Sequence, residues 1–594
     1  MSSDTKPAQG TWHRRTGSDN GGAASIRTLS GSEPEDAGLY SAPTSHEGPG
    51  YEVEVPTVTC RRYAVIMVGL PARGKTFLSQ KISRYLAWLG HESAVFNVQR
   101  MWRESLGVAV APKGSTGSPG TSEYMLGMGS AQPTAESGDG SGNTPPTAGS
   151  ATAKQQFIHA DTFFQAFVAN SKARPTSADL TDSTDKAPPS SNAGADEESP
   201  EATAYSAAVS HCVDRVKAFF GRGGLVAFLN DDFVTKASRD DVEARLQGVA
   251  DSVLYIEVLR DDAINARFEE LKVGNASEYG PEAGSRGAAT DLAKRIALLK
   301  SVYERVGDDK SFIRIRNGSH IDLHDVRGYL PSRMTSFLMH LAPQNKAFCP
   351  IYFSRHGQSE YNLEDRLGGN PLLTDKGHDD AVALKNFIAT IKEDNDRMLA
   401  QQEELRSAAA APDAPGGPQN LPQMQKPLQI WTSQLTRTIQ TARPAETELG
   451  IQCLRWRNLN EIHAGVCEHL TYAEVKEKYP LIHDFRKKNK YAFRYPDGES
   501  YQDLVARLEP VIMELENADR VVVVVAHQAV LRALLAYFGG SNAEHSVHVE
   551  VPHRTVWRCS YDASGIPTMD EMKLPPNPDP EAAKAAAAAW AKPT

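Results

Sequence analysis

The sequence of 594 residues contains few cysteines, and they are scattered. The six cysteines lie at positions 60, 212, 349, 453, 467 and 559, and none forms a Cys-x-x-Cys pair. A disulfide scaffold and a cysteine-rich zinc site both need clustered cysteines, so the sequence argues against either. Scattered cysteines are typical of a protein from a reducing compartment.

Long hydrophobic runs and an excess of basic charge are also missing. The longest apolar runs are Ala64–Leu70 and Val521–Ala526, whereas a membrane-spanning helix needs about 20 apolar residues. The N-terminal segment Met1–Thr28 is polar and shows no hydrophobic signal sequence. The formal net charge of −10 argues against a protein that coats nucleic acid. These features predict a cytoplasmic protein that has neither a membrane nor a nucleic acid as its partner.

Hydrophobic periodicity is absent from five segments that are rich in Gly, Pro, Ser or Ala. They are 1–55, about 105–154, 171–202, 400–426, which begins helical over Gln401–Leu405, and the tail 576–594. Such composition is typical of disordered extensions and surface insertions. The remaining ~400 residues suit two domains. We expect the first domain over 56–345, with two of the insertions, and the second over 346–575, with the insertion at 400–426. The boundary is expected near Ala342–Lys346.

Each predicted domain alternates β-branched runs with helical patterns. The predicted strands are Tyr63–Val68, Ala94–Val98, Leu225–Leu229 and Val253–Val258 in the first domain, and Pro350–Phe353, Leu428–Trp431 and Val521–Ala526 in the second. This alternation predicts two α/β domains, each built on a parallel sheet.

The first predicted strand runs into a phosphate-binding motif. The segment Gly69-Leu70-Pro71-Ala72-Arg73-Gly74-Lys75-Thr76 matches G-x-x-x-x-G-K-[ST], with a strand before it and a helix after it. Its glycines let backbone N–H groups surround a phosphate, and the helix N-terminus adds partial positive charge. We expect Lys75 to reach the β and γ phosphates and Thr76 to bind Mg²⁺.

Candidate partners for this motif come from other parts of the first domain. A carboxylate at the end of a neighbouring strand usually helps to hold Mg²⁺. Leu225–Leu229 is followed by Asn230, Asp231 and Asp232, so Asp231 and Asp232 are both candidate ligands, with Asp231 as our choice, although a solvated acidic turn explains them equally well. Arg100, Arg103, Lys272 and Arg295 could form an anion pocket, but each alone is more commonly a surface charge.

In the second domain, polar motifs follow three predicted strands. Ser354-Arg355-His356-Gly357 follows the first, and its imidazole suits a nucleophile that attacks phosphorus. Arg437 follows the second strand, and His527 follows the third directly. Glu461 offers a carboxyl group that can protonate a leaving alcohol. Because ligands gather at the C-terminal edge of a parallel sheet, we expect these side chains to converge there.

Several strings in this sequence resemble the 6-phosphofructo-2-kinase/fructose-2,6-bisphosphatase family, whose second domain is a histidine phosphatase of the phosphoglycerate mutase-like superfamily. They include Gly-Leu-Pro-Ala-Arg-Gly-Lys-Thr (69–76), Trp-Thr-Ser-Gln-Leu (431–435), Tyr-Pro-Asp-Gly-Glu-Ser-Tyr (495–501) and His-Gln-Ala-Val-Leu-Arg (527–532). The resemblance implies a P-loop NTPase-like parallel sheet followed by a histidine phosphatase α/β sandwich.

The resemblance also implies an activity and the residues that carry it. The phosphatase would hydrolyse the 2-phosphate of fructose 2,6-bisphosphate, with His356 as nucleophile and Glu461 as general acid. Arg355, Arg437 and His527 would hold the transferring phosphate, with help from Asn362. The sugar and its 6-phosphate would be held by Tyr472, Arg486, Lys490, Tyr501, Gln528 and Arg532. The segment 486–490 also suits an electrostatic funnel for a doubly phosphorylated sugar. Gln358 stands where the family has Glu.

In the first domain the resemblance implies ATP and Mg²⁺ as cofactors, whereas the phosphatase would require none. Lys272 matches a family lysine at the catalytic centre, Arg103 is the one arginine kept in its aligned segment, and Arg295 is retained. The family's metal-site segment Phe-Asp-Ala-Thr-Asn aligns with 228–232, with Leu229 at the position of the Asp, and His159 stands where an Arg binds fructose 6-phosphate. We therefore expect ATP binding with a dominant phosphatase.

Other readings of the function stay open at this point. They are a fully bifunctional kinase/phosphatase, an ATP-sensing pseudokinase that regulates the phosphatase, and a phosphatase or mutase that acts on substrates such as phosphoglycerate. Phosphorylated sugars are the expected small-molecule partners, and a homodimer is left open.

Overall fold

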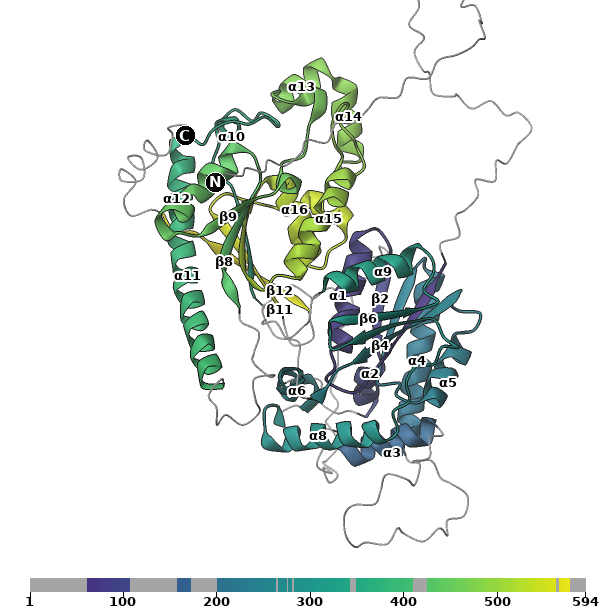
Figure 1. The fold of residues 1–594 in the computed structure, drawn as a ribbon. Coiled ribbons are helices and arrows are strands. Elements are labelled where there is room, and N and C mark those ends of the chain that lie inside the picture. The colour runs from purple at the N-terminus through teal and green to yellow at the C-terminus, as the bar shows by residue number, and fades with distance from the viewer. Residues whose placement is uncertain are drawn as a thin grey trace, which may run out of the picture. The chain divides into compact units, whose positions relative to one another are not determined.

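The structure is a computed structural model that describes residues 61–106, 158–171, 200–262, 265–274, 276–279, 282–341, 349–409, 425–561 and 566–576. Two six-stranded sheets carry the fold, and helices flank both (Figure 1). The domain bounds expected from the sequence stay predictions, and the expected boundary near 342–346 lies outside the described residues.

The first sheet has the strand order β2-β3-β1-β4-β5-β6. Its strands are parallel except β6, which pairs antiparallel with β5. The strands are β1 Tyr63–Val68, β2 Ser93–Asn97, β3 Val226–Asn230, β4 Ser252–Leu259, β5 Phe312–Arg316 and β6 His320–His324. The helices are α1 Lys75–Trp88, α2 Val98–Ser105, α3 Ala160–Ser171, α4 Pro200–Gly221, α5 Lys236–Leu246, α6 Ala266–Val273, α7 Ala276–Tyr279, α8 Arg286–Ser301 and α9 Tyr329–His340.

The second sheet has the strand order β12-β11-β7-β10-β8-β9. Strands β7 to β10 pair in parallel, and β11 and β12 add an antiparallel edge. The strands are β7 Ile351–Arg355, β8 Lys426–Thr432, β9 Gln452–Arg455, β10 Arg520–Ala526, β11 Thr555–Tyr561 and β12 Pro567–Lys573. The helices are α10 Glu360–Leu363, α11 Asp375–Ala409, α12 Thr436–Leu449, α13 Tyr472–Lys478, α14 Pro480–Lys488, α15 Tyr501–Glu516 and α16 Gln528–Phe538, with short 3₁₀ turns η5 Arg457–Leu459, η6 Gly465–Cys467 and η7 Ala543–His548.

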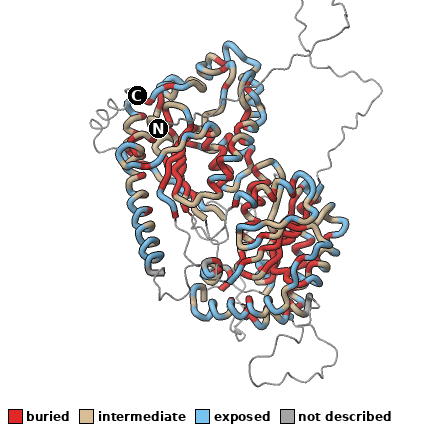
Figure 2. Tube along the Cα trace, in the orientation of Figure 1, coloured by how far each residue is buried: buried red, intermediate tan, exposed pale blue. Residues whose placement is uncertain are grey.

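The central strands β1 and β10 are buried on both faces because their side chains are apolar, apart from Arg520 at the start of β10. In β1, Ala64, Ile66 and Val68 pack into one hydrophobic cluster, and Tyr63, Val65 and Met67 pack into another. Strand β10 divides its valines between two clusters in the same alternating way. This is the period-two pattern of a strand that is covered by helices on both sides, and the buried strands stand out in Figure 2. The expected α/β class is confirmed.

Two of the expected insertions are shorter than the sequence suggested. Helix α4 begins at Pro200, inside the segment 171–202, and α11 continues to Ala409, inside the segment 400–426. Proline suits the first turn of a helix, since its missing N–H has no partner to lose there. The alanines at 408 and 409 are good helix formers that a purely compositional reading counts as low complexity. Of the described helices, none is long and apolar enough to span a membrane.

Candidate functional site

The first candidate site lies where β1 ends and α1 begins. Gly69 has φ +144°, and a Cβ there would lie 2.6 Å from the carbonyl oxygen of Val258, so the turn accepts only glycine. Gly74, with φ 87°, precedes the first turn of α1 in a left-handed conformation. The sequence therefore builds the strand–turn–helix geometry that exposes backbone N–H groups to a phosphate.

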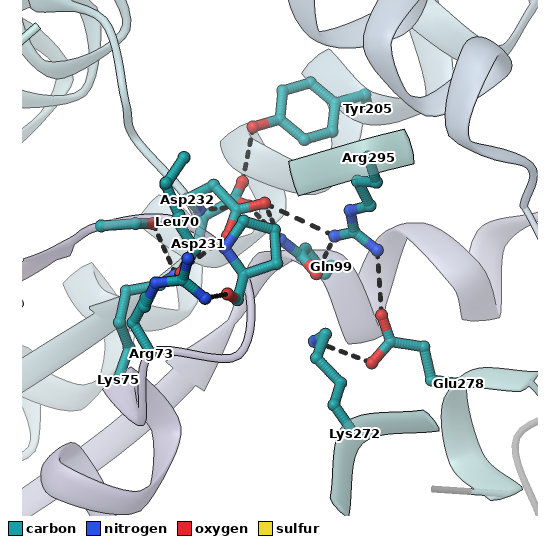
Figure 3. A network of polar contacts seen from close by, with 12 residues as sticks. Leu70, Arg73, Lys75, Gln99, Tyr205, Asp231, Asp232, Lys272, Glu278 and Arg295 are labelled. Atoms are coloured by element: carbon teal, nitrogen blue, oxygen red, sulfur yellow. Dashed lines mark hydrogen bonds and ion pairs between the residues drawn. The ribbon is translucent and has the colours of Figure 1, made fainter. Parts of the chain in front are cut away.

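The lysine of this loop is held by oxygen atoms in the structure. Lys75 Nζ donates to the carbonyl oxygens of Gly69 and Leu70 at 2.6 and 2.8 Å, and it pairs with Asp232 at 2.9 Å (Figure 3). Burial is the main reason that the pKa of Lys75 is lowered, although Asp232 opposes the shift. A phosphate could replace these oxygens and keep the charge paired.

The two aspartates after β3 play different parts. Asp232 contacts Lys75, whereas Asp231, the expected metal ligand, accepts hydrogen bonds from Gln99 and Tyr205. Burial raises the pKa of Asp231. Burial alone would also raise the pKa of Asp232, but Lys75 and Arg295 outweigh it and lower that pKa. Leu229 is fully buried in the core and cannot act as a ligand.

The residues fit the nucleotide and metal that the motif implies. Thr76 lies in the first turn of α1, and the Oδ1 atom of the buried Asn230 has no hydrogen-bond partner among the described residues. Asn230 Oδ1, the Asp232 carboxylate and the Thr76 hydroxyl are hard oxygen donors of the kind that Mg²⁺ prefers. These three residues and Lys75 are therefore the ones that would hold the metal and the phosphates.

The three cationic residues expected in this domain converge on one carboxylate. Glu278 pairs with Lys272 at 2.8 Å, with Arg295 at 2.9 Å and with Arg103 at 3.7 Å (Figure 3 shows the first two). Although burial would raise the pKa of Glu278, the three cations hold it far below its usual range. The cavity between Arg103, Glu278 and Arg295 measures only about 10 Å³, which is room for about one water molecule. Glu278 was not expected from the sequence.

The second candidate site lies at the C-terminal edge of the second sheet. Strands β7 and β10 are parallel neighbours, and Arg355 lies opposite Ala526. The next residues in the two strands' continuations, His356 and His527, therefore lie side by side at the C-terminal edge of the sheet. Their ring centroids lie 5.1 Å apart, and both side chains are buried. Arg437, in the first turn of α12, places its Nε atom 3.2 Å from His356 Nε2 and 3.2 Å from His527 Nδ1.

Hydrogen bonds fix the protonation of the proposed nucleophile. His356 Nδ1 lies 2.7 Å from the carbonyl oxygen of Gly357, which can only accept, so Nδ1 carries the proton. The lone pair is therefore on Nε2, where it accepts a hydrogen bond from Arg437 Nε. Burial, followed by Arg437 and Arg355, lowers the pKa of His356 well below 6.5. Burial and Arg437 do the same to the pKa of His527. Both rings are thus neutral.

Arg355 and Glu461 complete the reacting centre. Burial lowers the pKa of Arg355 to about 10, which leaves the guanidinium charged at neutral pH. Its Nη1 donates to Val551 O at 3.0 Å, while its buried Nε finds no partner among the described residues. Glu461 Oε1 accepts from the N–H groups of Ile462 and Ala529 at 3.1 and 3.2 Å. Glu461 also lines a cavity of about 820 Å³.

The residues expected to hold the sugar form two smaller sets. Arg486 donates to Tyr495 OH at 2.6 Å and to Tyr472 OH at 3.2 Å. Arg532 donates to Tyr501 OH at 3.4 Å, and the Lys490 ammonium lies 5.8 Å from the centroid of the Tyr501 ring. Burial, together with Arg532 and Arg486, lowers the pKa of Lys490 to about 8. A doubly charged phosphate would relieve this mutual repulsion.

Three further positions of this site are Asn362, Gln528 and Gln358. Asn362 Oδ1 closes a capping box at the start of α10, where it accepts from the N–H and hydroxyl of Ser359 at 3.0 Å each. Gln528, the first residue of α16, has a partly buried side chain. Gln358 Oε1 accepts from the Thr374 hydroxyl at 3.2 Å, so the replacement of the family's Glu is accommodated by a neutral partner.

Comparisons with known proteins find matches in both halves of the chain. Residues 51–114 match the family model of 6-phosphofructo-2-kinase, and residues 419–573 match that of the histidine phosphatase superfamily (branch 1). The chain is 31% identical over 517 residues to human 6-phosphofructo-2-kinase/fructose-2,6-bisphosphatase 3, which covers 86% of this chain and 76% of that protein. It is 32% identical over 510 residues to the Caenorhabditis elegans 6-phosphofructo-2-kinase/fructose-2,6-bisphosphatase. That match covers 84% of this chain and 85% of the nematode protein.

A third relative is longer. The 6-phosphofructo-2-kinase/fructose-2,6-bisphosphatase of Arabidopsis thaliana is 30% identical over 514 residues, which cover 85% of this chain and 53% of that protein. This chain thus spans about half the length of the plant relative, and three quarters or more of the human and nematode proteins. On these matches to both halves, the chain belongs to the 6-phosphofructo-2-kinase/fructose-2,6-bisphosphatase family.

Proposed function

We propose that the protein hydrolyses fructose 2,6-bisphosphate to fructose 6-phosphate and phosphate through a phosphohistidine on His356. One observation carries the proposal: the Nδ1 proton of His356 is held by the Gly357 carbonyl, so a lone pair on Nε2 faces Arg437 inside a buried site. A neutral imidazole beside fixed positive charge is the form that attacks a phosphoryl group.

In the first step the Nε2 lone pair of His356 forms the bond to phosphorus while the bond from phosphorus to the 2-oxygen of the sugar breaks. A protonated Glu461 gives its proton to the leaving oxygen. Arg355 and Arg437 bind the phosphoryl oxygens, whose negative charge is best stabilised by guanidinium groups. We assign His527 to the same phosphoryl group because Arg437 links it to His356.

In the second step water attacks the phosphohistidine. The Glu461 carboxylate accepts a proton from the water as the new oxygen–phosphorus bond forms. The bond from Nε2 to phosphorus breaks, and its electron pair returns to the ring. Phosphate leaves, and both residues regain their starting states. Arg486, Lys490 and Arg532 bind the 6-phosphate and orient the sugar, assisted by Tyr472, Tyr501 and Gln528.

The first domain binds ATP with Mg²⁺ in this proposal, and the bound nucleotide supplies a phosphoryl donor. Lys75 would exchange its carbonyl and carboxylate partners for phosphate oxygens, and Thr76 and Asp232 would hold the metal. The sugar-phosphate acceptor would occupy the neighbourhood of Arg103 and Arg295, where Glu278 now neutralises the cations and leaves about 10 Å³. This closed arrangement supports a dominant phosphatase.

A fully bifunctional enzyme is the second candidate, because the P-loop and the cation cluster are both present. A pair of assays on the purified full chain separates the candidates: phosphate release from fructose 2,6-bisphosphate, and its synthesis from ATP, Mg²⁺ and fructose 6-phosphate. His356→Ala is included to prevent breakdown of any product. We expect hydrolysis by the wild type and none by His356→Ala.

Synthesis by His356→Ala would establish the bifunctional enzyme. Hydrolysis without synthesis, together with ATP binding that alters the phosphatase rate, would leave the first domain as a nucleotide sensor. Undiminished hydrolysis by His356→Ala would contradict the phosphohistidine mechanism. A panel that includes phosphoglycerate checks the substrate, since we expect little activity towards a compound that cannot reach both His356 and the cluster at Arg486.

A further inference from the structure

His553 contacts the backbone of the proposed nucleophile, although no motif in the sequence pointed to it. It lies just before β11, in the segment Val551-Pro552-His553-Arg554. Its Nδ1 atom is 3.0 Å from the carbonyl oxygen of His356, and because a carbonyl can only accept, His553 donates. The two rings meet edge to face, with centroids 5.9 Å apart.

The peptide group between His356 and Gly357 is held at both ends. His553 binds its carbonyl oxygen, and its N–H donates to the Thr441 hydroxyl at 2.9 Å. The Thr441 hydroxyl donates in turn to Arg437 O at 2.6 Å. A peptide group that is planar and bonded on two sides cannot rotate, so the next carbonyl, that of Gly357, keeps its direction towards His356 Nδ1.

Arg554, the residue after His553, stabilises the same loop through two aspartates. Its guanidinium pairs with Asp379 at 2.7 Å and with Asp380 at 3.3 Å, and Asp380 accepts from the N–H of Gln358 at 3.1 Å. The backbone of Arg554 is left-handed, with φ 57°, a conformation that non-glycine residues rarely adopt. The dipeptide thus supports the nucleophile loop on both sides of Gly357.

We propose that His553 is a positioning residue for phosphoryl transfer: its hydrogen bond to the His356 carbonyl holds the Nδ1–H tautomer of His356 and keeps Nε2 aimed at phosphorus. The proposal rests on the proposed phosphatase function. In this role His553 acts through the backbone of His356.

The surroundings of His553 exclude a role as a second proton donor at neutral pH. The ring is largely buried, and the charged groups that act on it are the cations Arg355 and Lys376. Burial, followed by Arg355, lowers the pKa of His553 to about 4. The neutral ring still carries the Nδ1 hydrogen that it donates, so the hydrogen bond persists across the physiological range.

The test compares His553→Asn with His553→Leu in the full chain. The Asn amide can place an N–H near the position of Nδ1, whereas Leu has similar bulk and no donor. His545→Leu is the matched control, since His545 is an exposed histidine of η7. We expect His553→Leu to lower kcat for fructose 2,6-bisphosphate roughly 10- to 100-fold with KM within about twofold, the size of loss seen when a supporting hydrogen bond or a near-attack geometry is lost.

His553→Asn should stay within about threefold of the wild type in kcat. A second readout does not depend on substrate: the ¹⁵N chemical shifts of His356 should show Nδ1–H in the wild type and His553→Asn, and a tautomer mixture in His553→Leu. Equal kcat losses in both variants, a loss confined to KM, or an unchanged His356 tautomer in His553→Leu would overturn the proposal. Absence of hydrolysis by the wild type would contradict the substrate instead, and the tautomer would still decide the role of His553.

Discussion

A single N–H group serves both histidines of the phosphatase site. The Nε atom of Arg437 carries one hydrogen and lies 3.2 Å from a ring nitrogen of each. Both nitrogens must offer lone pairs, because a protonated ring would point a second N–H at the guanidinium. Arriving phosphoryl oxygens give Arg437 better acceptors than either imidazole. When the substrate binds, Arg437 therefore exchanges its hydrogen bond to His356 for one to a phosphoryl oxygen, which leaves the His356 Nε2 lone pair free to attack.

The neutral state of these rings has a consequence for stability at low pH. The pKa values of His356 and His527 lie well below 6.5 in the fold, and that of His553 is about 4. In the unfolded chain these rings bind protons near pH 6.5, so stability is lost as pH falls below that value. We expect each ring to lower the unfolding free energy by up to ~1.4 kcal/mol per pH unit there.

Urea unfolding at pH 7.5, 6.5 and 5.5 measures this loss. His553→Asn removes one of the three titrating rings and keeps an N–H donor, so its curve should fall less steeply than that of the wild type. Parallel curves for the two proteins would show that His553 takes up a proton equally in the folded and unfolded states, against the prediction.

Among the elements, the start of α11 sets the shape of the nucleophile loop. A Cβ on Gly357 would lie 2.3 Å from the carbonyl oxygen of Gly377, and a Cβ on Gly377 would lie 2.0 Å from the carbonyl oxygen of Gln358. The two backbones are in direct contact, so only glycine fits on either side. The first turn of α11 thus packs directly against the loop that carries His356 and limits its backbone conformation.

Gly357→Ala should consequently damage both stability and catalysis. The clash is with backbone, so the loop must move, and we expect a loss of ~1–3 kcal/mol in unfolding free energy. A shift of about 1 Å at His356 should lower kcat by up to ~100-fold. Thermal melting and phosphate release measure the two effects. Gly221→Ala, at the end of α4 with no atom within 4 Å of the new Cβ, is the control and should be neutral. A fully active Gly357→Ala enzyme would contradict this account.

The elements also show how far the sequence could be interpreted. The P-loop, His356, Arg437 and His527 were predictable because each follows a predicted strand, and strand ends share one edge of a sheet. Glu278 and His553 were not, since their partners lie far away in the chain and no local pattern marks a long-range pair. The choice of Asp232 over Asp231 depended on side-chain direction at the end of β3. The ends of α4 and α11 were missed because Pro and Ala are ambiguous at helix ends.

On the scale of the whole molecule, a buried ion cluster joins α1 to α15. Glu516 of α15 pairs with Lys81 at 2.6 Å and with Arg84 at 2.5 Å, both on α1, and its side chain has no exposed surface. Tyr537 and Tyr561 donate to it at 2.8 and 3.0 Å. Burial opposes ionisation, but Arg84 and Lys81 lower the pKa of Glu516 to about 2. Trp88 of α1 packs into the hydrophobic cluster of the second sheet.

Glu516→Gln should therefore destabilise both halves together. It leaves Lys81 and Arg84 buried without a counter-charge, which costs about 3–5 kcal/mol in comparable cases. We expect a single unfolding transition at lower temperature in calorimetry. Glu514→Gln, on the exposed face of the same helix, should melt like the wild type. Two separate transitions, or an unchanged melting temperature, would show that the cluster does not couple the halves.

This ion cluster also bears on why both halves stay in one chain. A second domain expressed alone would expose Glu516 and the apolar surface that receives Trp88. Mutations that silence the kinase-like site would leave Lys81, Arg84 and Trp88 still needed to cover that surface. Selection on the phosphatase alone would then preserve the first domain, whatever its own turnover, and gene fission between the halves would be disfavoured.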